Sequence, residues 1–228
     1  MRTSTSTSPA AQDYLKGIFA LEQGTQDGAP RPVSTKAIAD KMNVSPASTT
    51  NMLKKLGSMG LVRHVPYRGA ELTDAGRKVA LEVIRHHRLL ETYLAEALGV
   101  PWDKVHEEAE ILEHVLSDEL EDRIAARLGD PVVDPHGHPI PTKDLAMPVA
   151  SRDVLWQVAD GGEAQVDRVS DSEAEALRYL ARLGIKPGVH VHVIERGPVD
   201  GPLFVRVEGS LNEVHAISRE LAEAVWVA

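Results

Sequence analysis

Two closely spaced helix starts constrain the fold of this chain more than any other feature of its sequence. Ser34 is a good N-cap for a short helix over residues 35–42, because its side chain can accept a hydrogen bond from a free backbone N–H. Ser45 caps a second helix that begins at Pro46, where the missing N–H of proline costs little, and Gly60 ends it. Since only a tight turn separates them, the two helices are predicted to form a helix-turn-helix pair.

Elements on either side extend this pair into a larger unit. Residues 10–23 carry apolar side chains at a helical period, which predicts a helix before the pair. Residues 61–65 and 70–73 read as two strands joined by a turn over 66–69. Helices followed by a two-stranded hairpin are typical of a winged helix-turn-helix, in which the helix from Pro46 would be the recognition helix.

The exposed face of this recognition helix is suited to DNA. Short hydroxyl and amide side chains can reach base edges, whereas lysine and arginine suit phosphates. We therefore expect DNA contacts from Ser45, Ala47, Ser48, Thr49, Asn51, Lys54 and Lys55 on the helix and from Arg63 and Arg68 on the wing. A winged helix that binds another protein is the alternative, but the residues on this face do not indicate a protein ligand.

The net charge of −9 is unevenly spread along the 228 residues. Up to Thr73 there are nine Lys and Arg against five Asp and Glu, a net charge of +4, so the remainder carries −13. A basic front on an acidic body can bind a polyanion through the front. The acidic total therefore does not exclude DNA binding.

The chain contains no cysteine, which excludes disulfides, iron–sulfur clusters and thiol catalysis. Any metal site must then use oxygen and nitrogen ligands. No apolar run is long enough to span a membrane, and residues 1–9 lack the apolar core of a signal peptide. We therefore expect a cytoplasmic protein with no membrane partner and a disordered lead-in over residues 1–9.

A helix expected over residues 103–116 is rich in candidate metal ligands. On such a helix His106, Glu110, Glu113 and His114 lie along one stripe, and no Lys or Arg accompanies them there. An acidic surface with incidental histidines is the alternative reading of this helix taken alone.

A second helix, expected over residues 74–98, carries His87 and Glu91 four residues apart. Two helices that each carry a His/Glu pair at this spacing suggest metal sites with nitrogen and oxygen ligands between them. Both helices, and a third over 119–128, also carry apolar stripes that need a partner. Because the domain in front is small, a symmetric dimer is the natural way to cover these stripes.

The last part of the chain changes pattern twice. Residues 131–148 hold five prolines and predict an irregular linker, in which His136 and His138 are expected to face solvent. From Val149 onward short strands surround a helix, which is typical of a small SH3-like barrel. The strands are expected at 153–158, 163–169, 190–195, 203–207 and 224–227, with helical segments at 172–183 and 212–221.

The predicted fold is thus mainly α with small β parts. It has a winged helix-turn-helix DNA-binding domain at residues 1–73, a helical metal-binding and dimerisation domain at 74–148, and an SH3-like domain at 149–228. His190 and His192 alternate on one face of a predicted strand, and we expect a surface or structural role for them.

From Gln12 to Val227 the chain resembles the diphtheria-toxin-repressor family of metal-dependent transcriptional regulators. Several motifs occur in one order, which is far more specific than any motif alone. They are DYL at 13–15, SP at 45–46, LTDAGR at 72–77, RHHRLLE at 85–91, VHEEAE at 105–110, EHVLS at 113–117, PHGHPIP at 135–141 and LGIKPG at 183–188, the last resembling the entry to the family's SH3-like (FeoA-like) domain.

The resemblance implies a regulatory metal site made by Asp13, Glu110, Glu113 and His114. In the iron-sensing branch of the family, Met and Cys occupy the positions of Asp13 and Glu110, whereas both are carboxylates here, as in the manganese-sensing branch. Carboxylate oxygens suit Mn²⁺ better than sulfur does, so we expect Mn²⁺, with Fe²⁺ as the second candidate.

The resemblance also implies an ancillary site, whose ligands would be His87, Glu91, His106 and one residue of the SH3-like domain. Glu173 is the candidate for that residue, with Glu175 and Asp171 as its rivals.

Lys16 stands where the manganese branch has a carboxylate, which favours two separate metal sites per subunit over a closely spaced binuclear site. The implied function is a homodimer that binds pseudo-palindromic operator DNA when loaded with divalent metal ions and represses metal-uptake genes. A metal-independent winged-helix DNA-binding protein is the first alternative. The second is a metal-dependent hydrolase, but the sequence shows no obvious cleft or phosphate-binding loop, so we expect no enzyme activity.

Overall fold

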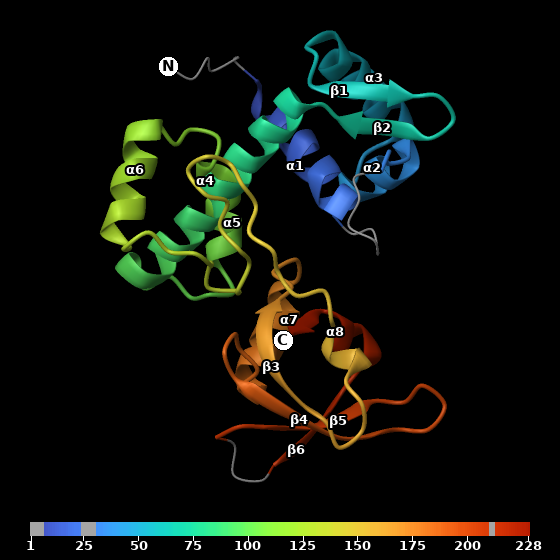
Figure 1. Cartoon of the computed structure of the whole chain (residues 1–228), viewed down its shortest axis with the longest axis vertical. Helices are drawn as coiled ribbons and strands as arrows, with labels where there is room; N and C mark the ends of the chain where they lie inside the picture. The colour runs from blue at the N-terminus through green and yellow to red at the C-terminus, as the bar shows by residue number, and fades with distance from the viewer. Residues whose placement is uncertain (1–6, 24–30, 210–212) are drawn as a thin grey trace. The chain divides into compact units, whose positions relative to one another are not determined.

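The computed structural model describes residues 7–23, 31–209 and 213–228, and Figure 1 shows the order of its helices and strands. The chain divides into two compact units, one of residues 1–86 and 141–146, the other of residues 87–140 and 147–228. Most of the lead-in expected over residues 1–9 and the start of the segment expected at 212–221 lie outside the described residues. None of the described helices is both long and apolar enough to cross a membrane.

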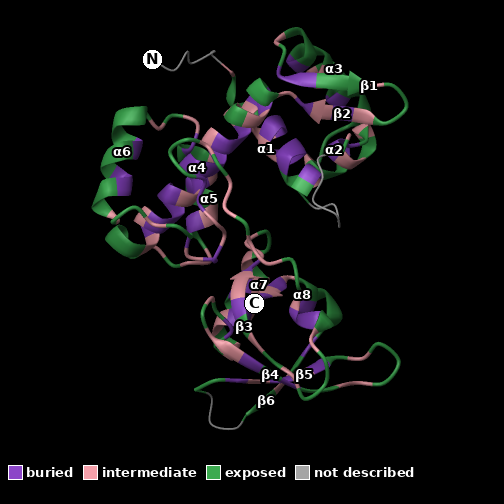
Figure 2. Ribbon diagram, in the orientation of Figure 1, coloured by how far each residue is buried: buried purple, intermediate pink, exposed green. Residues whose placement is uncertain are grey.

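The first unit contains the predicted winged helix-turn-helix. Helices α1 (Pro9–Gln23), α2 (Thr35–Lys41) and α3 (Pro46–Ser58) precede a hairpin of β1 (Val62–Val65) and β2 (Gly69–Leu72). Their apolar faces form the core of this unit, which Figure 2 shows as buried residues on the helices. The fully buried side chains include Leu15, Ile18, Ile38 and Leu56.

Two serines cap the helices on either side of the tight turn, as predicted. Ser34 Oγ accepts a hydrogen bond from the backbone N–H of Ala37 at 3.1 Å, and Ser45 Oγ accepts one from Ser48 at 3.2 Å. Pro46 occupies the first turn of α3, where it leaves no hydrogen bond unmade. These local signals fix where the recognition helix begins.

A buried carboxylate ties the wing to the first helix. Glu22 of α1 accepts a hydrogen bond from the backbone N–H of Leu72 in β2 at 2.9 Å and another from Arg77 at 2.5 Å. Glu22 is 1 % exposed, so these donors replace the water that a carboxylate would otherwise need. Arg77 belongs to the long helix α4 (Asp74–Leu98), which therefore joins the same contact.

The second unit begins with three helices around a small core. Helix α4 supplies residues to both units, and α5 (Val105–Leu112) and α6 (Asp118–Arg127) follow it. Helix α5 ends at Leu112 rather than near residue 116, so Glu113 is its C-cap and His114 lies in the next turn. The buried side chains of this core are Leu89, Leu90, Ala109, Ile124, Ala125 and Ile140.

The described residues at the C-terminal end form a five-stranded antiparallel sheet in the order β6-β5-β4-β3-β7, as expected for an SH3-like domain. Buried residues alternate with half-buried or exposed ones along its central strands, and the buried ones face a single apolar core. The strands and helices are β3 (Glu163–Val169), α7 (Ala174–Leu183), β4 (His190–Arg196), β5 (Leu203–Val207), β6 (Val214–Ile217), α8 (Arg219–Glu223) and β7 (Val225–Val227).

Two predictions in this region are wrong. Residues 153–158 contain the 3₁₀ turn η1 (Leu155–Gln157) instead of a strand, because Leu155 and Trp156 are both buried and consecutive strand residues point to opposite faces. The segment predicted as helical at 212–221 contains strand β6 before α8 begins.

Candidate metal centre and DNA-binding face

Helices α4 and α5 and the loop before α7 bring four candidate metal ligands together in the second unit. His87 Nε2 lies 3.0 Å from Glu91 Oε1 and 3.1 Å from His106 Nδ1. Asp171 Oδ2 lies 3.6 Å from His106 Nδ1. One ligand atom from each of the four residues lies within 4.8 Å of the others, so the group can surround a single ion.

These separations fit a divalent metal ion. Ligand atoms bound to one ion at about 2.1 Å stand about 3.0–3.4 Å from one another. The group offers two imidazoles and two carboxylates, a donor set that Mn²⁺, Fe²⁺ and Zn²⁺ all accept. Glu91 Oε2 is buried and makes no hydrogen bond with the described part of the chain, and metal coordination would satisfy it.

The two carboxylates of this group are ionised at neutral pH. Burial by itself would raise the pKa of Glu91, but hydrogen bonds from histidines, His106 first among them, outweigh it and hold the pKa well below its usual range. Burial also opposes ionisation of Asp171, whose pKa is nevertheless lowered, chiefly by the charge of His138. Metal binding at this group would therefore not have to displace protons from its carboxylates.

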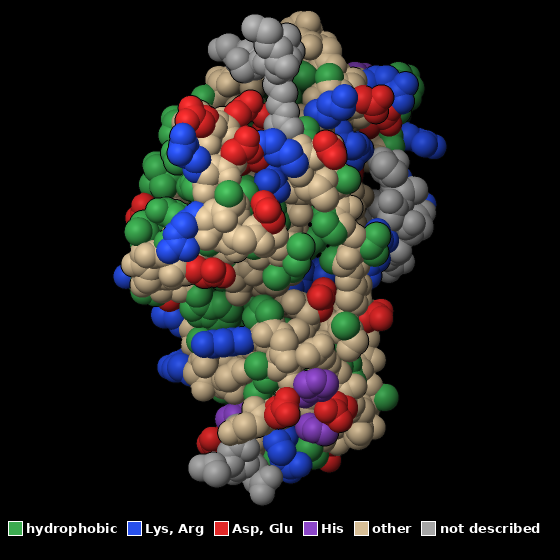
Figure 3. All heavy atoms as spheres, turned by 60° about the vertical axis from the view of Figure 1, so that its left-hand side comes forward, with side chains coloured by type: hydrophobic (Ala, Val, Ile, Leu, Met, Phe, Trp, Pro, Cys, Tyr) green, Lys and Arg blue, Asp and Glu red, His purple; other side chains and the backbone are tan. Residues whose placement is uncertain are grey.

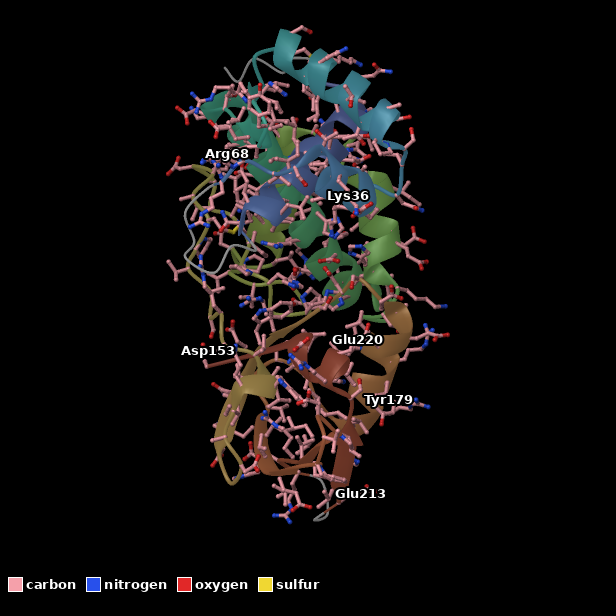
Figure 4. The ribbon with its side chains drawn as sticks, turned by 90° about the vertical axis from the view of Figure 1, so that its right-hand side faces the viewer. Lys36, Arg68, Asp153, Tyr179, Glu213 and Glu220 are labelled. Atoms are coloured by element: carbon pink, nitrogen blue, oxygen red, sulfur yellow. The ribbon has the colours of Figure 1, made fainter. Side chains whose placement is uncertain are left out.

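Asp171, not Glu173, is the SH3-like-domain residue beside these histidines. Glu173 is the exposed N-cap of α7, where it lines a shallow hollow of about 520 Å³ together with Tyr179 and Glu220. Figure 4 labels Tyr179 on α7 and Glu220 on α8. The chain turns between residues 171 and 173, so two acids that are close in sequence face different surroundings.

His136 is buried and the side chain of His138 is only 14 % exposed, so the expectation that both face solvent is wrong. The side chain of His136 is 0 % exposed, with Nε2 2.8 Å from the carbonyl oxygen of Trp102 and Nδ1 3.8 Å from Glu91 Oε1. The loop folds inward because Asp134 Oδ1 accepts the backbone N–H groups of His136 and His138, at 2.8 and 3.0 Å. Asp134, His136 and His138 form a second group of candidate ligands, which the D-x-H-x-H spacing could have signalled.

The protonation of His136 bears on this second group. Burial lowers the pKa of His136, but the nearby carboxylate of Glu91, the charge of Asp134 and the hydrogen bond with the carbonyl oxygen of Trp102 raise the pKa to about 9. His136 is therefore protonated at neutral pH in the metal-free protein. A metal ion at Asp134, His136 and His138 would have to displace that proton.

The residues expected at the regulatory site are divided between the two units. In the second unit, His87 Nδ1 lies 2.5 Å from Glu113 Oε2 and 3.7 Å from Glu110 Oε1, and His114 Nε2 lies 3.6 Å from Glu113 Oε1. Glu113 is 1 % exposed. Asp13 lies on α1 in the first unit, so its part in this site remains a prediction.

Most of the predicted DNA contacts on α3 are exposed, but Thr49 is not. Thr49 is 0 % exposed and its hydroxyl donates to the carbonyl oxygen of Ser45 at 3.2 Å. It lies two turns from the buried Leu56 and so shares the inward face of α3. The exposed residues are Ser45, Ala47, Ser48, Asn51, Lys54 and Lys55.

The wing offers one free cation and one paired cation. Arg63 of β1 is the register partner of Glu71 in β2, and its Nε donates to that carboxylate at 2.7 Å. Arg68 lies exposed in the turn of the hairpin, and Figure 4 labels it. Part of the charge of Arg63 is therefore neutralised inside the hairpin, while Arg68 has no acidic partner among the described residues.

Three known protein families match successive parts of the chain. Residues 6–70 match the N-terminal DNA-binding domain of the iron-dependent repressors, and residues 73–142 match their metal-binding and dimerisation domain. Residues 154–228 match the FeoA domain.

Similarity also extends over nearly the full length of individual relatives. The diphtheria toxin repressor of Corynebacterium efficiens is 38 % identical over 224 residues, which cover 94 % of this chain and 93 % of the relative. The iron-dependent repressor IdeR of Mycobacterium leprae is 30 % identical over 227 residues, with 94 % of both chains covered. This chain belongs to the diphtheria-toxin-repressor family.

Solved structures of the family agree with this assignment. A manganese-dependent transcriptional repressor in complex with manganese is 41 % identical, with a TM-score of 0.87 and coverage of 96 % of this chain and 99 % of that one. The manganese regulator SloR is 32 % identical, with a TM-score of 0.78 and coverage of 97 % and 99 %. As a member of the diphtheria-toxin-repressor family, the chain is a metal-dependent transcriptional repressor and not an enzyme.

Proposed function

We propose that this member of the family is a manganese-responsive homodimer that acts in the cytoplasm, binds pseudo-palindromic operator DNA when loaded with metal, and represses metal-uptake genes. The observation that carries the proposal is the donor chemistry around Glu110 and Glu113, which offers carboxylates and imidazoles in a chain without cysteine. Oxygen-rich sites suit Mn²⁺, and Fe²⁺ is the second candidate. The 41 % identity with a manganese-dependent repressor supports the same metal.

The regulatory site is proposed to consist of Asp13, Glu110, Glu113 and His114, as the family motifs imply. In the metal-free state its three carboxylates repel one another, and this repulsion is relieved when a divalent cation is bound. Because Asp13 belongs to the helix that leads into the winged helix, metal binding at this site would favour the arrangement of the two recognition helices that fits successive major grooves. Metal affinity and DNA affinity must then be linked reciprocally.

For the second metal ion of each subunit we propose His87, Glu91, His106 and Asp171 as ligands. Distances of 3.0–3.6 Å from His87 to Glu91 and His106 and from His106 to Asp171 support this choice, as do the burial of His87 and Glu91 and the ionised state of Glu91 and Asp171. The neighbouring group Asp134, His136 and His138 is the alternative, and it requires the loss of a proton from His136.

The homodimer would be formed by the helices after the winged helix. Ile111, Val115 and Leu120 are 69 %, 78 % and 48 % exposed on and after α5, although all three are apolar. Exposed apolar side chains this close in the sequence indicate an interaction surface, and a second copy of the chain supplies a matching one.

The test is DNA binding to the promoter region of the chain's own gene, first in EDTA and then with Mn²⁺, Fe²⁺ under anaerobic conditions, or Zn²⁺. We expect DNA binding only in the presence of metal. Once the general affinity of each ion for such ligands is taken into account, Mn²⁺ should support DNA binding at a lower free concentration than Fe²⁺ or Zn²⁺. Binding that is unchanged by EDTA would overturn the proposal and support a metal-independent winged-helix protein.

A further inference from the structure

The outward face of the C-terminal sheet carries another cluster of potential ligands. His190 and His192 are two residues apart on β4, so both point away from the core that the buried Val191 and Val193 face. Glu163 of β3 is the register partner of His192. The three side chains are 42–50 % exposed, and Figure 3 shows histidine and acidic side chains side by side on the surface where this sheet lies.

Glu163 stands at the centre of this cluster. Its Oε1 lies 3.1 Å from His190 Nδ1 and 3.6 Å from His192 Nε2. Ligands around one tetrahedral zinc ion stand about 3.3 Å apart, so both distances are close to those of a metal site. The two imidazoles stand farther from each other than from Glu163. The site proposed below requires a side-chain rotation that brings the imidazoles together, and side chains this exposed change conformation readily.

This cluster contributes little to the stability of the fold. An exposed hydrogen bond or ion pair contributes little to stability, and the core of the sheet lies on its other face. The stability of the fold therefore does not explain why two histidines and an acid from two strands lie together.

We propose that Glu163, His190 and His192 form a surface site for a divalent metal ion of the zinc and copper type. Two imidazoles and one carboxylate are a ligand set used by zinc sites that keep an open fourth position. Nitrogen-rich sites bind Cu²⁺ and Zn²⁺ more tightly than Mn²⁺, following the order of stability of these divalent ions. The site thus selects a different metal from the oxygen-rich group around Glu110 and Glu113, and it does not depend on the function proposed for that group.

A neighbouring cation limits the affinity of this site. Arg206 of β5 is the other register partner of His192 and lies on the same face of the sheet. Its positive charge opposes the binding of a second cation nearby. Replacing Arg206 by a neutral side chain should therefore strengthen metal binding, which is the opposite of what loss of a ligand does.

The decisive experiment compares the zinc content of the full chain with that of the His190→Gln/His192→Gln double variant, by equilibrium dialysis and metal analysis over a range of free Zn²⁺. We expect the parent chain to hold one more equivalent of zinc than the variant, with equal Mn²⁺ content and equal Mn²⁺-dependent DNA binding. Equal zinc content would overturn the proposal. The unchanged Mn²⁺ response shows that the variant is folded.

Three single variants complete the test. His64→Gln replaces an exposed histidine on the wing strand β1, and we expect it to keep the full zinc content. Glu163→Gln should lower the affinity for the extra zinc ion about tenfold or more, whereas Arg206→Gln should raise it several-fold. If neither Glu163→Gln nor Arg206→Gln changes the affinity for the extra zinc ion, zinc is not held at this site.

Discussion

At the scale of single residues, His87 connects the two buried groups of the second unit. Its Nδ1 lies 2.5 Å from Glu113 Oε2, while its Nε2 faces Glu91 and His106. A neutral imidazole has one donor and one acceptor nitrogen, so donation to Glu113 leaves the Nε2 lone pair for the ancillary group. One ring can thus orient a ligand of the proposed regulatory site while it serves as a ligand of the other site.

The dual role of His87 leads to a prediction about metal affinity. We expect His87→Gln to abolish binding of one Mn²⁺ ion and to weaken the other by about tenfold or more, because Glu113 loses the partner that orients it. Calorimetric titration with Mn²⁺ measures both effects. If the second ion binds as tightly as in the parent chain, His87 belongs to the ancillary group alone.

Asp13 is the proposed regulatory ligand that comes from the first unit. Replacement of Asp13 by alanine should abolish metal-stimulated DNA binding and leave the dimer intact, since the loss of one carboxylate removes a ligand but no part of the dimer surface. Fluorescence anisotropy with operator DNA and size-exclusion chromatography check the two halves of this prediction. The exposed Asp40 of α2 offers a matched control, Asp40→Ala, that should keep the metal response. Full metal stimulation in Asp13→Ala would remove Asp13 from the site.

The raised pKa of His136 predicts how stability depends on pH in the metal-free protein. Its pKa is about 9 when folded against 6.5 for an ordinary histidine. The stabilisation is therefore complete below about pH 6.5 and is lost as the pH rises through 9, which amounts to about 3 kcal/mol. Urea unfolding in EDTA at pH 6.5 and pH 9 should show this decrease, and His136→Gln should reduce it. Equal stability at both pH values in the parent chain would contradict the buried ion pair with Glu91.

At the scale of single elements, the two faces of α3 have separate tasks. The inward face packs through Leu56 and Thr49, and the outward face exposes polar and basic residues. Thr49 shows why a hydroxyl in a recognition helix is not by itself a base contact. Its side chain satisfies a backbone carbonyl within the helix instead.

The outward lysines of α3 should contribute charge without sequence preference. We expect Lys54→Ala and Lys55→Ala each to weaken specific and non-specific DNA binding to a similar extent and to reduce the salt dependence of binding by about one unit of slope. Titrations at several salt concentrations measure this slope. Thr49→Val should leave the slope unchanged, because its side chain is buried. A lysine variant that alters binding to one sequence only would instead indicate a base contact.

At the scale of the whole molecule, the distributions of charge and of exposed apolar side chains suit two partners, DNA and a second copy of the chain. The net charge of −9 conceals a basic N-terminal part, which is the part that matches a DNA-binding domain. The acidic remainder includes the part that matches a metal-binding and dimerisation domain, where apolar side chains stay exposed in the single chain. Both distributions are consistent with a dimer that meets DNA through its basic ends.

Dimer formation can be tested through one of these apolar side chains. Val115→Glu should convert the dimer to a monomer at micromolar concentration and lower operator affinity at least tenfold, because a buried charge would be left without a partner. Light scattering after size exclusion gives the mass. Val199→Glu is the matched control, since Val199 is 100 % exposed and lies outside the helical region. An unchanged mass for Val115→Glu would place the dimer interface elsewhere.

The sequence by itself determined the elements whose signals are local. Capping serines and a proline at a helix start act within one turn of the chain, so the boundaries of α2 and α3 could be read directly. The i, i+4 spacing of His87 and Glu91 likewise fixes their common face on α4, whatever else the chain does. The motifs at these positions were enough to indicate the diphtheria-toxin-repressor family.

Only the tertiary structure decided which distant residues share a site. The burial of His136 depends on hydrogen bonds that backbone N–H groups of its loop donate to Asp134 and on packing of the loop against α4, and no local pattern records that packing. The choice of Asp171 over Glu173 depends on where the chain turns before α7. Ligand sets are made by contacts between segments far apart in the chain, whereas helix starts are made by neighbours. The sequence therefore gives the candidates for a metal centre, and folding selects among them.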